Sequence, residues 1–160
     1  MAALRIRALL SSDATACDAI VRALPYHFGN ELGRRECAEA VRRQQGLAAV
    51  GDDGTLLGFM TMVRHSPETV EITWMAVHAD HRRGGIGTAL MEHLAGEMAS
   101  RGVKALFVLT LGPSSHEDVE DSYEGTRRFY LKAGFMPLRE FDLTAWDDPA
   151  LVLVRPLTSH

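Results

Sequence analysis

The hydrophobic positions of the chain repeat with two periods, one typical of strands and one typical of helices. The order in which the two patterns occur predicts the secondary structure. Alternating positions and short continuous apolar runs predict strands, because successive side chains of a strand point to opposite faces. Strands are expected over seven segments: Ala3–Leu9, Leu47–Val50, Leu56–Val63, Val70–Val77, Lys104–Leu111, Met136–Leu143 and Leu151–Leu157. The run over Lys104–Leu111 is apolar throughout, which predicts a strand in the interior of the sheet.

Apolar residues spaced three and four positions apart predict helices between these strands. Such a face appears within Thr88–Arg101, at Leu90, Met91, Leu94 and Met98, and Gly102 closes that helix. Other helices are expected from a capping Ser11 or Ser12 to about Leu24, over Arg34–Gln45, and around Tyr130 up to Gly134. The order of elements predicts an α/β domain with a central mixed, mostly antiparallel sheet flanked by helices.

Composition limits what kind of protein this is. The chain has 160 residues, 46% of them hydrophobic and 24% charged, which suits one globular domain over 1–160. A net charge of −4 argues against a nucleic-acid partner. No apolar stretch is long enough to cross a membrane. Cys17 and Cys37 fall in helical patterns, where reduced and buried thiols are expected, so the expected location is cytoplasmic.

A glycine-rich turn at residues 82–88 joins an expected strand to an expected helix. Helix N-termini carry unpaired N–H groups and partial positive charge, so such a turn favours phosphate binding. A P-loop would need a lysine after Gly87, where Thr88 stands, and a dinucleotide fingerprint would need a third glycine, where Leu90 stands. The spacing Arg-x-x-Gly-x-Gly remains, formed by Arg82, Gly85 and Gly87.

This spacing resembles the coenzyme A pyrophosphate loop of the GCN5-related N-acetyltransferase (GNAT) family. A second family signature lies about forty residues downstream, matched by Phe129, Tyr130, Gly134 and Phe135. The resemblance spans nearly the whole chain and implies the acetyltransferase fold, with acetyl-CoA as the co-substrate. One departure is Gly84, where many members of the family carry a basic residue, and Arg83 can compensate for it.

The resemblance also implies roles for individual residues. The main chain of Arg83, Gly84, Gly85, Ile86, Gly87 and Thr88 would hold the pyrophosphate, together with the Arg82 side chain. The strand residues Met75, Ala76 and Val77 would lie beside the coenzyme, with the Val77 N–H facing the thioester carbonyl. Tyr130 would be the general acid that protonates the leaving thiolate.

The base that deprotonates the amine is expected to be Glu71. Strand alternation predicts that Glu71 shares a face with Thr73, Met75 and Val77. The run from Glu71 to Val77 resembles a strand of histone acetyltransferases in which the matching glutamate is the general base. His78 and His81 remain alternative bases, because imidazole titrates near neutral pH.

The resemblance further implies that the loop between the first two helices lines the acceptor pocket, where Tyr26 and Phe28 would bind the substrate together with Glu71. Five acids ahead of the Tyr130 helix would favour a cationic amine: Glu117, Asp118, Glu120, Asp121 and Glu124. No residue pattern suits a metal ion or a covalent nucleophile, so direct attack by the amine is expected.

The expected activity is therefore acetyl transfer to a small-molecule or protein amine, without a nucleic-acid or membrane partner. An exposed edge strand would permit a homodimer. Two alternatives stay open: an acyl-CoA-binding module without turnover, and an acyltransferase that uses a longer acyl chain or another acceptor.

Overall fold

A central sheet organises the computed structural model, which describes residues 4–24, 31–81, 84–111, 124–142 and 149–158. Its seven strands are ordered β1-β2-β3-β4-β5-β7-β6. Their bounds are β1 Arg5–Ala8, β2 Gln45–Val50, β3 Leu56–Ser66, β4 Thr69–Val77, β5 Ala105–Leu111, β6 Met136–Phe141 and β7 Ala150–Pro156. All neighbouring strands are antiparallel except β4 and β5, so the predicted mixed, mostly antiparallel sheet is confirmed.

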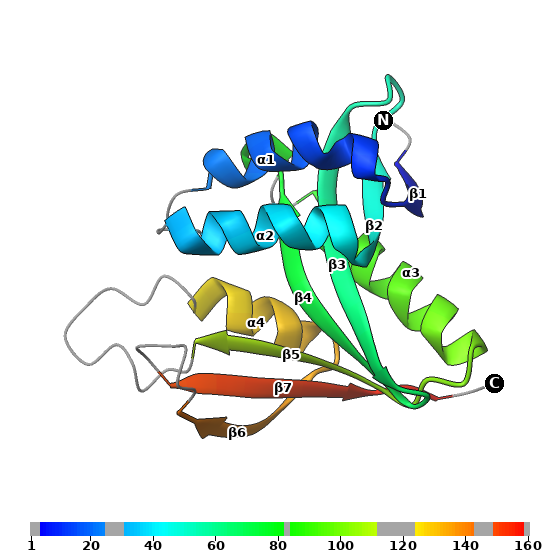
Figure 1. Ribbon diagram of the computed structural model, residues 1–160. Helices are drawn as coiled ribbons and strands as arrows, with labels where there is room; N and C mark the ends of the chain where they lie inside the picture. Colours follow the sequence, from blue (N-terminus) through cyan, green and yellow to red (C-terminus); the bar gives the residue numbers. More distant parts are fainter. Residues whose placement is uncertain (1–3, 25–30, 82–83, 112–123, 143–148, 159–160) are drawn as a thin grey trace.

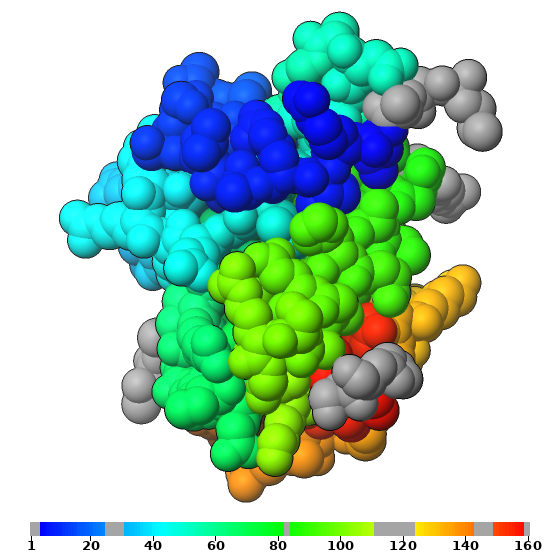
Figure 2. Space-filling view, turned by 90° about the vertical axis from the view of Figure 1, so that its right-hand side faces the viewer, coloured from blue at the N-terminus to red at the C-terminus, as the bar shows by residue number. Residues whose placement is uncertain are grey.

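Helices cover both faces of the sheet (Figure 1). On one face lie α1 (Ala14–Arg22) and α2 (Glu31–Arg43), whose buried residues pack with Phe59 and Ala76. On the other face lie α3 (Ile86–Ser100) and α4 (Glu124–Lys132), which share a core with the inner strands. Figure 2 shows α3 running across the surface below the α1–α2 layer.

The predicted apolar face of the third helix is confirmed, since Leu90, Met91, Leu94 and Met98 are all buried. The prediction that Ser11 or Ser12 caps the first helix is wrong. Ser11–Asp13 form a 3₁₀ turn, η1, before α1 begins at Ala14. In that turn the Asp13 carboxylate accepts a hydrogen bond from the Leu10 N–H at 2.8 Å and pairs with Arg7. Hydrogen bonds to a charged group are stronger than neutral ones, so the Arg7–Asp13 pair stabilises the 3₁₀ turn in which both serines lie.

The most important feature for the site is that β4 and β5 separate. Their parallel ladder runs from Thr69 opposite Ala105 to Ile72 opposite Val108 and ends there. Beyond it, β4 continues to Val77 and pairs with β3 alone, while β5 continues beside β7. Figure 1 shows the two strands diverging, with α4 behind the angle between them.

A β-bulge in β4 lies where the separation begins. Thr61 pairs with Trp74 and Met62 pairs with Ile72, so Thr73 is an extra residue without an opposite partner. A bulge of this kind bends its strand and turns the following side chains to the other face. Here it accompanies the departure of β4 from β5.

Candidate active site

The part of β4 that has left β5 keeps main-chain donors on its open side. The His78 N–H donates to the Leu57 carbonyl at 2.7 Å, which fixes the direction of hydrogen bonding between these strands. Because this direction alternates along an antiparallel pair, the N–H groups of Met75 and Val77 point away from β3. They face the side from which β5 has departed, while the Ala76 side chain is buried against α1 and α2.

The glycine-rich turn leads into α3, as the sequence predicts. Gly85 has a φ of +81°, a left-handed conformation that favours glycine, and the first helical bond runs from Ala89 to Gly85 at 2.9 Å. The N–H groups of Ile86, Gly87 and Thr88 therefore have no helical acceptor. Arg82 and Arg83 lie outside the described residues.

Gly87 has a second role that the sequence analysis does not foresee. A Cβ added there would lie 3.2 Å from Met75 Cε and 3.2 Å from the Phe129 ring. The two family signatures therefore touch, because the glycine turn packs directly on the aromatic residue beside Tyr130. The absence of a side chain at Gly87 allows α3 and α4 to approach each other here.

Tyr130 lies on α4 in the core beside this contact. Its ring packs edge-on against Phe129 and Phe135, with centroids 5.3 and 5.2 Å away. The side chain is buried, and within the described parts of the chain its hydroxyl has no hydrogen-bond partner. Burial raises the pKa of Tyr130, so the hydroxyl keeps its proton at any physiological pH.

Glu71 lies on the sheet face that carries α2, and this corrects one prediction. Glu71, Thr73 and Trp74 face α2, whereas Met75 and Val77 pack into the core under α3. The prediction that Glu71 shares a face with Met75 and Val77 is wrong because the bulge at Thr73 interrupts the alternation of side chains.

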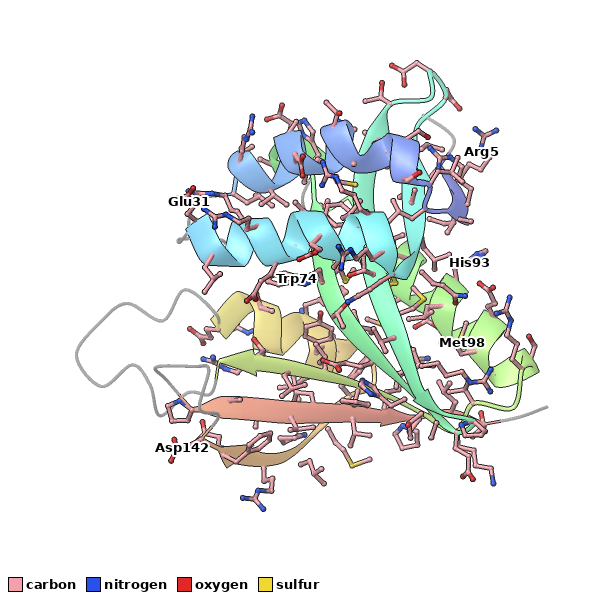
Figure 3. All side chains as sticks on the ribbon, viewed as in Figure 1. Arg5, Glu31, Trp74, His93, Met98 and Asp142 are labelled. Atoms are coloured by element: carbon pink, nitrogen blue, oxygen red, sulfur yellow. The ribbon has the colours of Figure 1, made fainter. Side chains whose placement is uncertain are left out.

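A groove of about 390 Å³ lies between α2 and this part of β4. It is lined by Glu36, Glu39, Ala40, Arg43, Gln44, Glu71, Thr73 and Trp74. Figure 3 places Trp74 below α2, near the point where β4 and β5 part. The Thr73 hydroxyl donates to the Gln44 side-chain oxygen and lies 2.7 Å from the Thr61 hydroxyl, so the bulge is tied to the end of α2.

His65 is a residue that sequence reasoning missed. Its Nε2 lies 2.8 Å from the Glu71 Oε1, and its ring packs on Phe107 of β5. The signal that could have revealed it is the turn at Ser66-Pro67-Glu68, because folding the chain back there brings His65 beside the start of the next strand. The pairing register, which the sequence does not reveal, decides the contact.

The alternative bases lie away from this groove. His78 and His81 follow the end of β4, and their rings are 5.4 Å apart. The His78 Nδ1 accepts the Asp80 N–H at 3.1 Å, and neither ring lines the groove that holds Glu71. Of the three candidate bases, Glu71 is therefore the one that lines the groove.

Several predicted acceptor residues lie outside the described residues: Tyr26, Phe28, Glu117, Asp118, Glu120 and Asp121. Glu124 begins α4 and pairs with Arg128 at 2.8 Å. Among the described residues, no three His, Cys, Asp or Glu side chains gather as metal ligands. No helix in the described ranges is long and apolar enough to cross a membrane.

Known structures share this arrangement of strands and helices. A structure assigned to the GNAT acetyltransferases, from Desulfovibrio desulfuricans, has a TM-score of 0.82 and 21% identity, covering 98% of this chain and 100% of that chain. The ribosomal-protein-S18-alanine N-acetyltransferase of Escherichia coli has a TM-score of 0.75 and 20% identity, and the match covers 99% of this chain and 96% of that chain. An aminoglycoside 6'-N-acetyltransferase complexed with coenzyme A has a TM-score of 0.74 and 20% identity, covering 98% of each chain.

A comparison with curated protein sequences finds no significant match. The family comparison is decisive, because the acetyltransferase (GNAT) family model matches residues 14–135, which include both signatures and the whole of β4. The chain therefore belongs to the acetyltransferase (GNAT) family.

Proposed function

We propose that this protein transfers an acetyl group from acetyl-CoA to a primary amine by direct attack. The observation that carries the proposal is the separation of β4 from β5 beyond Ile72. Within the described part of the chain, the Met75 and Val77 N–H groups of β4 have no strand partner on that side, and the buried Tyr130 hydroxyl in the adjoining core has no hydrogen-bond partner. A buried hydroxyl without a partner costs roughly 1–3 kcal/mol, so a ligand atom that accepts its hydrogen bond would be stabilised there.

The coenzyme would be held mainly by main-chain atoms. The N–H groups of Ile86, Gly87 and Thr88, at the positive end of α3, suit a pyrophosphate, and Gly84 and Gly85 leave the approach free of side chains. We assign Arg82 and Arg83 to the same anion. The pantetheine arm would continue along Met75, Ala76 and Val77, where two N–H groups point into the opening.

The reaction needs a neutral amine. A lysine-like amine has a pKa of about 10.4, so reaching its neutral form at pH 7 costs roughly 4.6 kcal/mol, which a base can offset in part. Glu71 would take this proton, and the nitrogen would bond to the thioester carbonyl carbon while the Val77 N–H stabilises the oxygen. The carbon–sulfur bond then breaks, and Tyr130 protonates the departing thiolate. The attacking nitrogen gives up its second proton, which restores the Tyr130 phenol, and the proton held by Glu71 passes to solvent.

The two reactants would reach the opening from opposite faces of the sheet. Tyr130 and the start of α3 lie on one face, while Glu71 and the groove lie on the face of α2. This division lets the coenzyme and the acceptor bind at the same time. It supports a ternary complex, in which the amine attacks the thioester directly, over a covalent acyl-enzyme.

The groove favours a cationic acceptor. Glu36, Glu39 and Glu71 contribute negative charge, of which Arg43 offsets part through its ion pair with Glu39 at 3.1 Å. Trp74 offers an aromatic face of the kind that binds ammonium groups. Tyr26 and Phe28 are assigned to the same acceptor site. One structural neighbour is named for an aminoglycoside and another for a protein alanine, so both small-molecule and protein amines are candidates.

Two further expectations belong to this proposal. A cytoplasmic site of action rests on the free and buried thiols of Cys17 and Cys37. A homodimer would use an edge of the sheet, where β1 and β6 each pair with one neighbour in the described part of the chain.

The test is an assay of coenzyme A thiol release with acetyl-CoA and a panel of amines, run with cationic polyamines, amino sugars, peptide amino groups and neutral amines. We expect release with cationic primary amines, and binding of coenzyme A by calorimetry. Coenzyme binding without release for any amine would support the silent binding module. Faster thiol release from longer acyl-CoAs would support the alternative of an acyltransferase that uses a longer acyl chain. An absence of both coenzyme A binding and thiol release would overturn the proposal.

A further inference from the structure

The candidate base Glu71 has one side-chain partner among the described residues, and that partner is a histidine. The His65 Nε2 lies 2.8 Å from the Glu71 Oε1, at hydrogen-bond distance. His65 comes from β3 and Glu71 from β4, and the two strands pair throughout this region. An ionised carboxylate can only accept, so the imidazole donates from Nε2.

The imidazole is itself held in place from a third strand. The His65 and Phe107 ring centroids are 5.5 Å apart with the planes at 36°, and Phe107 on β5 lies opposite Glu71 in the parallel ladder. His65 is also the extra residue of a second irregularity, since Arg64 pairs with Val70 and Ser66 pairs with Thr69. Bulges re-aim side chains, and this one brings the His65 ring beside Glu71.

The contact with His65 engages only one of the two oxygens of the Glu71 carboxylate. Oε1 accepts from His65, while Oε2 has no hydrogen-bond partner among the described residues, and the Glu71 side chain is 20% exposed on the groove. The charged groups facing the groove from α2 are Glu36, Glu39 and Arg43, and Arg43 is paired with Glu39. None of these gives Glu71 a hydrogen bond that would replace the one from His65.

We propose that His65 is a positioning residue for Glu71, holding one carboxylate oxygen so that the other faces the acceptor nitrogen. This inference rests on the proposed function, because it assigns a task to the base of that reaction. A misplacement of about 1 Å in a reacting group can lower the rate roughly 100-fold, so a fixed donor at this position has a measurable effect.

The experiment compares His65→Leu with His65→Gln. Leucine removes the donor, and glutamine keeps an N–H donor near the position of Nε2. We expect His65→Leu to lower kcat roughly 10- to 100-fold with KM changed less than about twofold, and His65→Gln to recover most of kcat. The matched control is His93→Leu, a similarly exposed histidine on α3 that lies 3.8 Å from Glu97, and it keeps wild-type kinetics.

The variant Glu71→Gln, measured beside these variants, distinguishes a failure of the proposed function from a failure of the proposed role of His65. No thiol release by the wild-type enzyme would overturn the proposed function and this inference with it. If Glu71→Gln is inactive while His65→Leu is fully active, only the role of His65 is wrong. If His65→Gln is as impaired as His65→Leu, the hydrogen bond is not what matters, and the inference fails.

A spectroscopic measurement checks the pairing without turnover. In the wild-type protein near pH 8, ¹⁵N spectra of the imidazole should show His65 protonated on Nε2 alone, because that atom donates to Glu71. In Glu71→Leu the preference for this tautomer should fall. An unchanged tautomer in Glu71→Leu would contradict the contact on which the inference depends. Thermal unfolding of each variant confirms that the fold is retained.

Discussion

We propose that Tyr130 favours activity at a cost in stability. Its ring packs well between Phe129 and Phe135, but its hydroxyl is buried without a hydrogen-bond partner among the described residues. Phenylalanine would fill the same space without that cost. The proposed role as general acid gives a reason for a tyrosine here, because a phenol can donate to a leaving thiolate.

The variant Tyr130→Phe should therefore change activity and stability in different directions. We expect kcat to fall roughly 10- to 1,000-fold, with coenzyme affinity nearly unchanged. The free energy of unfolding should stay the same or rise, because an unsatisfied buried hydroxyl is removed. Steady-state kinetics, calorimetry and urea unfolding measure the three quantities. An unchanged kcat would remove Tyr130 from the mechanism.

At this scale the sequence could name candidate residues but could not predict their surroundings. Tyr130 and Glu71 could be named because they lie in short motifs of fixed spacing. The face on which Glu71 lies could not be predicted, because one extra residue at Thr73 reverses the alternation. His65 was missed because its contact depends on the pairing register of two strands.

The start of α3 is the element that should bind the coenzyme, and its geometry allows a matched comparison. Gly85 and Gly54 have φ values of +81° and +80°, and a Cβ added to either meets nothing within 4 Å. A side chain in this left-handed conformation costs about 1–2 kcal/mol. Gly54 lies in the turn between β2 and β3, far along the chain from the anion-binding turn.

Gly85→Ala and Gly54→Ala should therefore lose similar stability but differ in coenzyme binding. We expect both to lower the free energy of unfolding by about 1 kcal/mol. Only Gly85→Ala should weaken the binding of coenzyme A, because this substitution disturbs the turn that orients the N–H groups of Ile86 to Thr88. Calorimetric titration of each variant with coenzyme A measures the two affinities. Equal affinities in the two variants would mean that the pyrophosphate is held elsewhere.

The α1–α2 layer carries two thiols that respond to alkaline pH. Cys17 and Cys37 are buried, and burial raises the pKa of each thiol from 9.0 to about 12. In the unfolded chain these thiols lose their protons near pH 9, whereas the folded protein keeps them until about pH 12. The unfolded state then binds fewer protons, so stability falls as pH rises through this window.

Urea unfolding between pH 8 and pH 10.5, under reducing conditions, should show this loss. Each thiol contributes a slope of at most about 1.4 kcal/mol per pH unit. Cys17→Ala and Cys37→Ala should each flatten the slope, even though both lower the stability at pH 7 by removing buried atoms. Slopes parallel to that of the wild-type protein would show that the thiols do not cause the alkaline loss.

At the level of elements, periodicity and glycines predicted most boundaries within about three residues. Gly102 and Gly134 end α3 and α4 as expected, with φ values of +84° and +94°. The predicted cap of the first helix by Ser11 or Ser12 was wrong because both serines lie in a 3₁₀ turn, in which the Asp13 carboxylate is held by Arg7 of β1. Short-range patterns do not contain that tertiary contact.

At the scale of the whole molecule, the protein has two halves joined along a short ladder. β1 to β4 form one part of the sheet and β5 to β7 the other, and the ladder between them joins Thr69–Ile72 to Ala105–Val108. The Glu68 carbonyl extends this connection by accepting from the Lys104 N–H at 2.7 Å. The shared core beneath α3 and α4 completes the connection. The separation of β4 from β5 was expected from the family resemblance and not from the residue pattern, because strand pairing depends on contacts far apart in sequence.

A coenzyme seated in this opening would contact both halves, so its binding should stabilise the whole fold. A ligand that binds only the folded state adds RT ln(1 + [L]/Kd), which is about 2.7 kcal/mol at 100 times Kd. For a chain of this size we expect saturating coenzyme A to raise Tm by roughly 5–10 °C. Gly85→Ala should show a smaller rise than Gly54→Ala at the same coenzyme concentration. If coenzyme A leaves the Tm of the wild-type protein unchanged, it does not bind between the two halves, and the main-chain donors of β4 and α3 that lack a partner among the described residues must have another explanation.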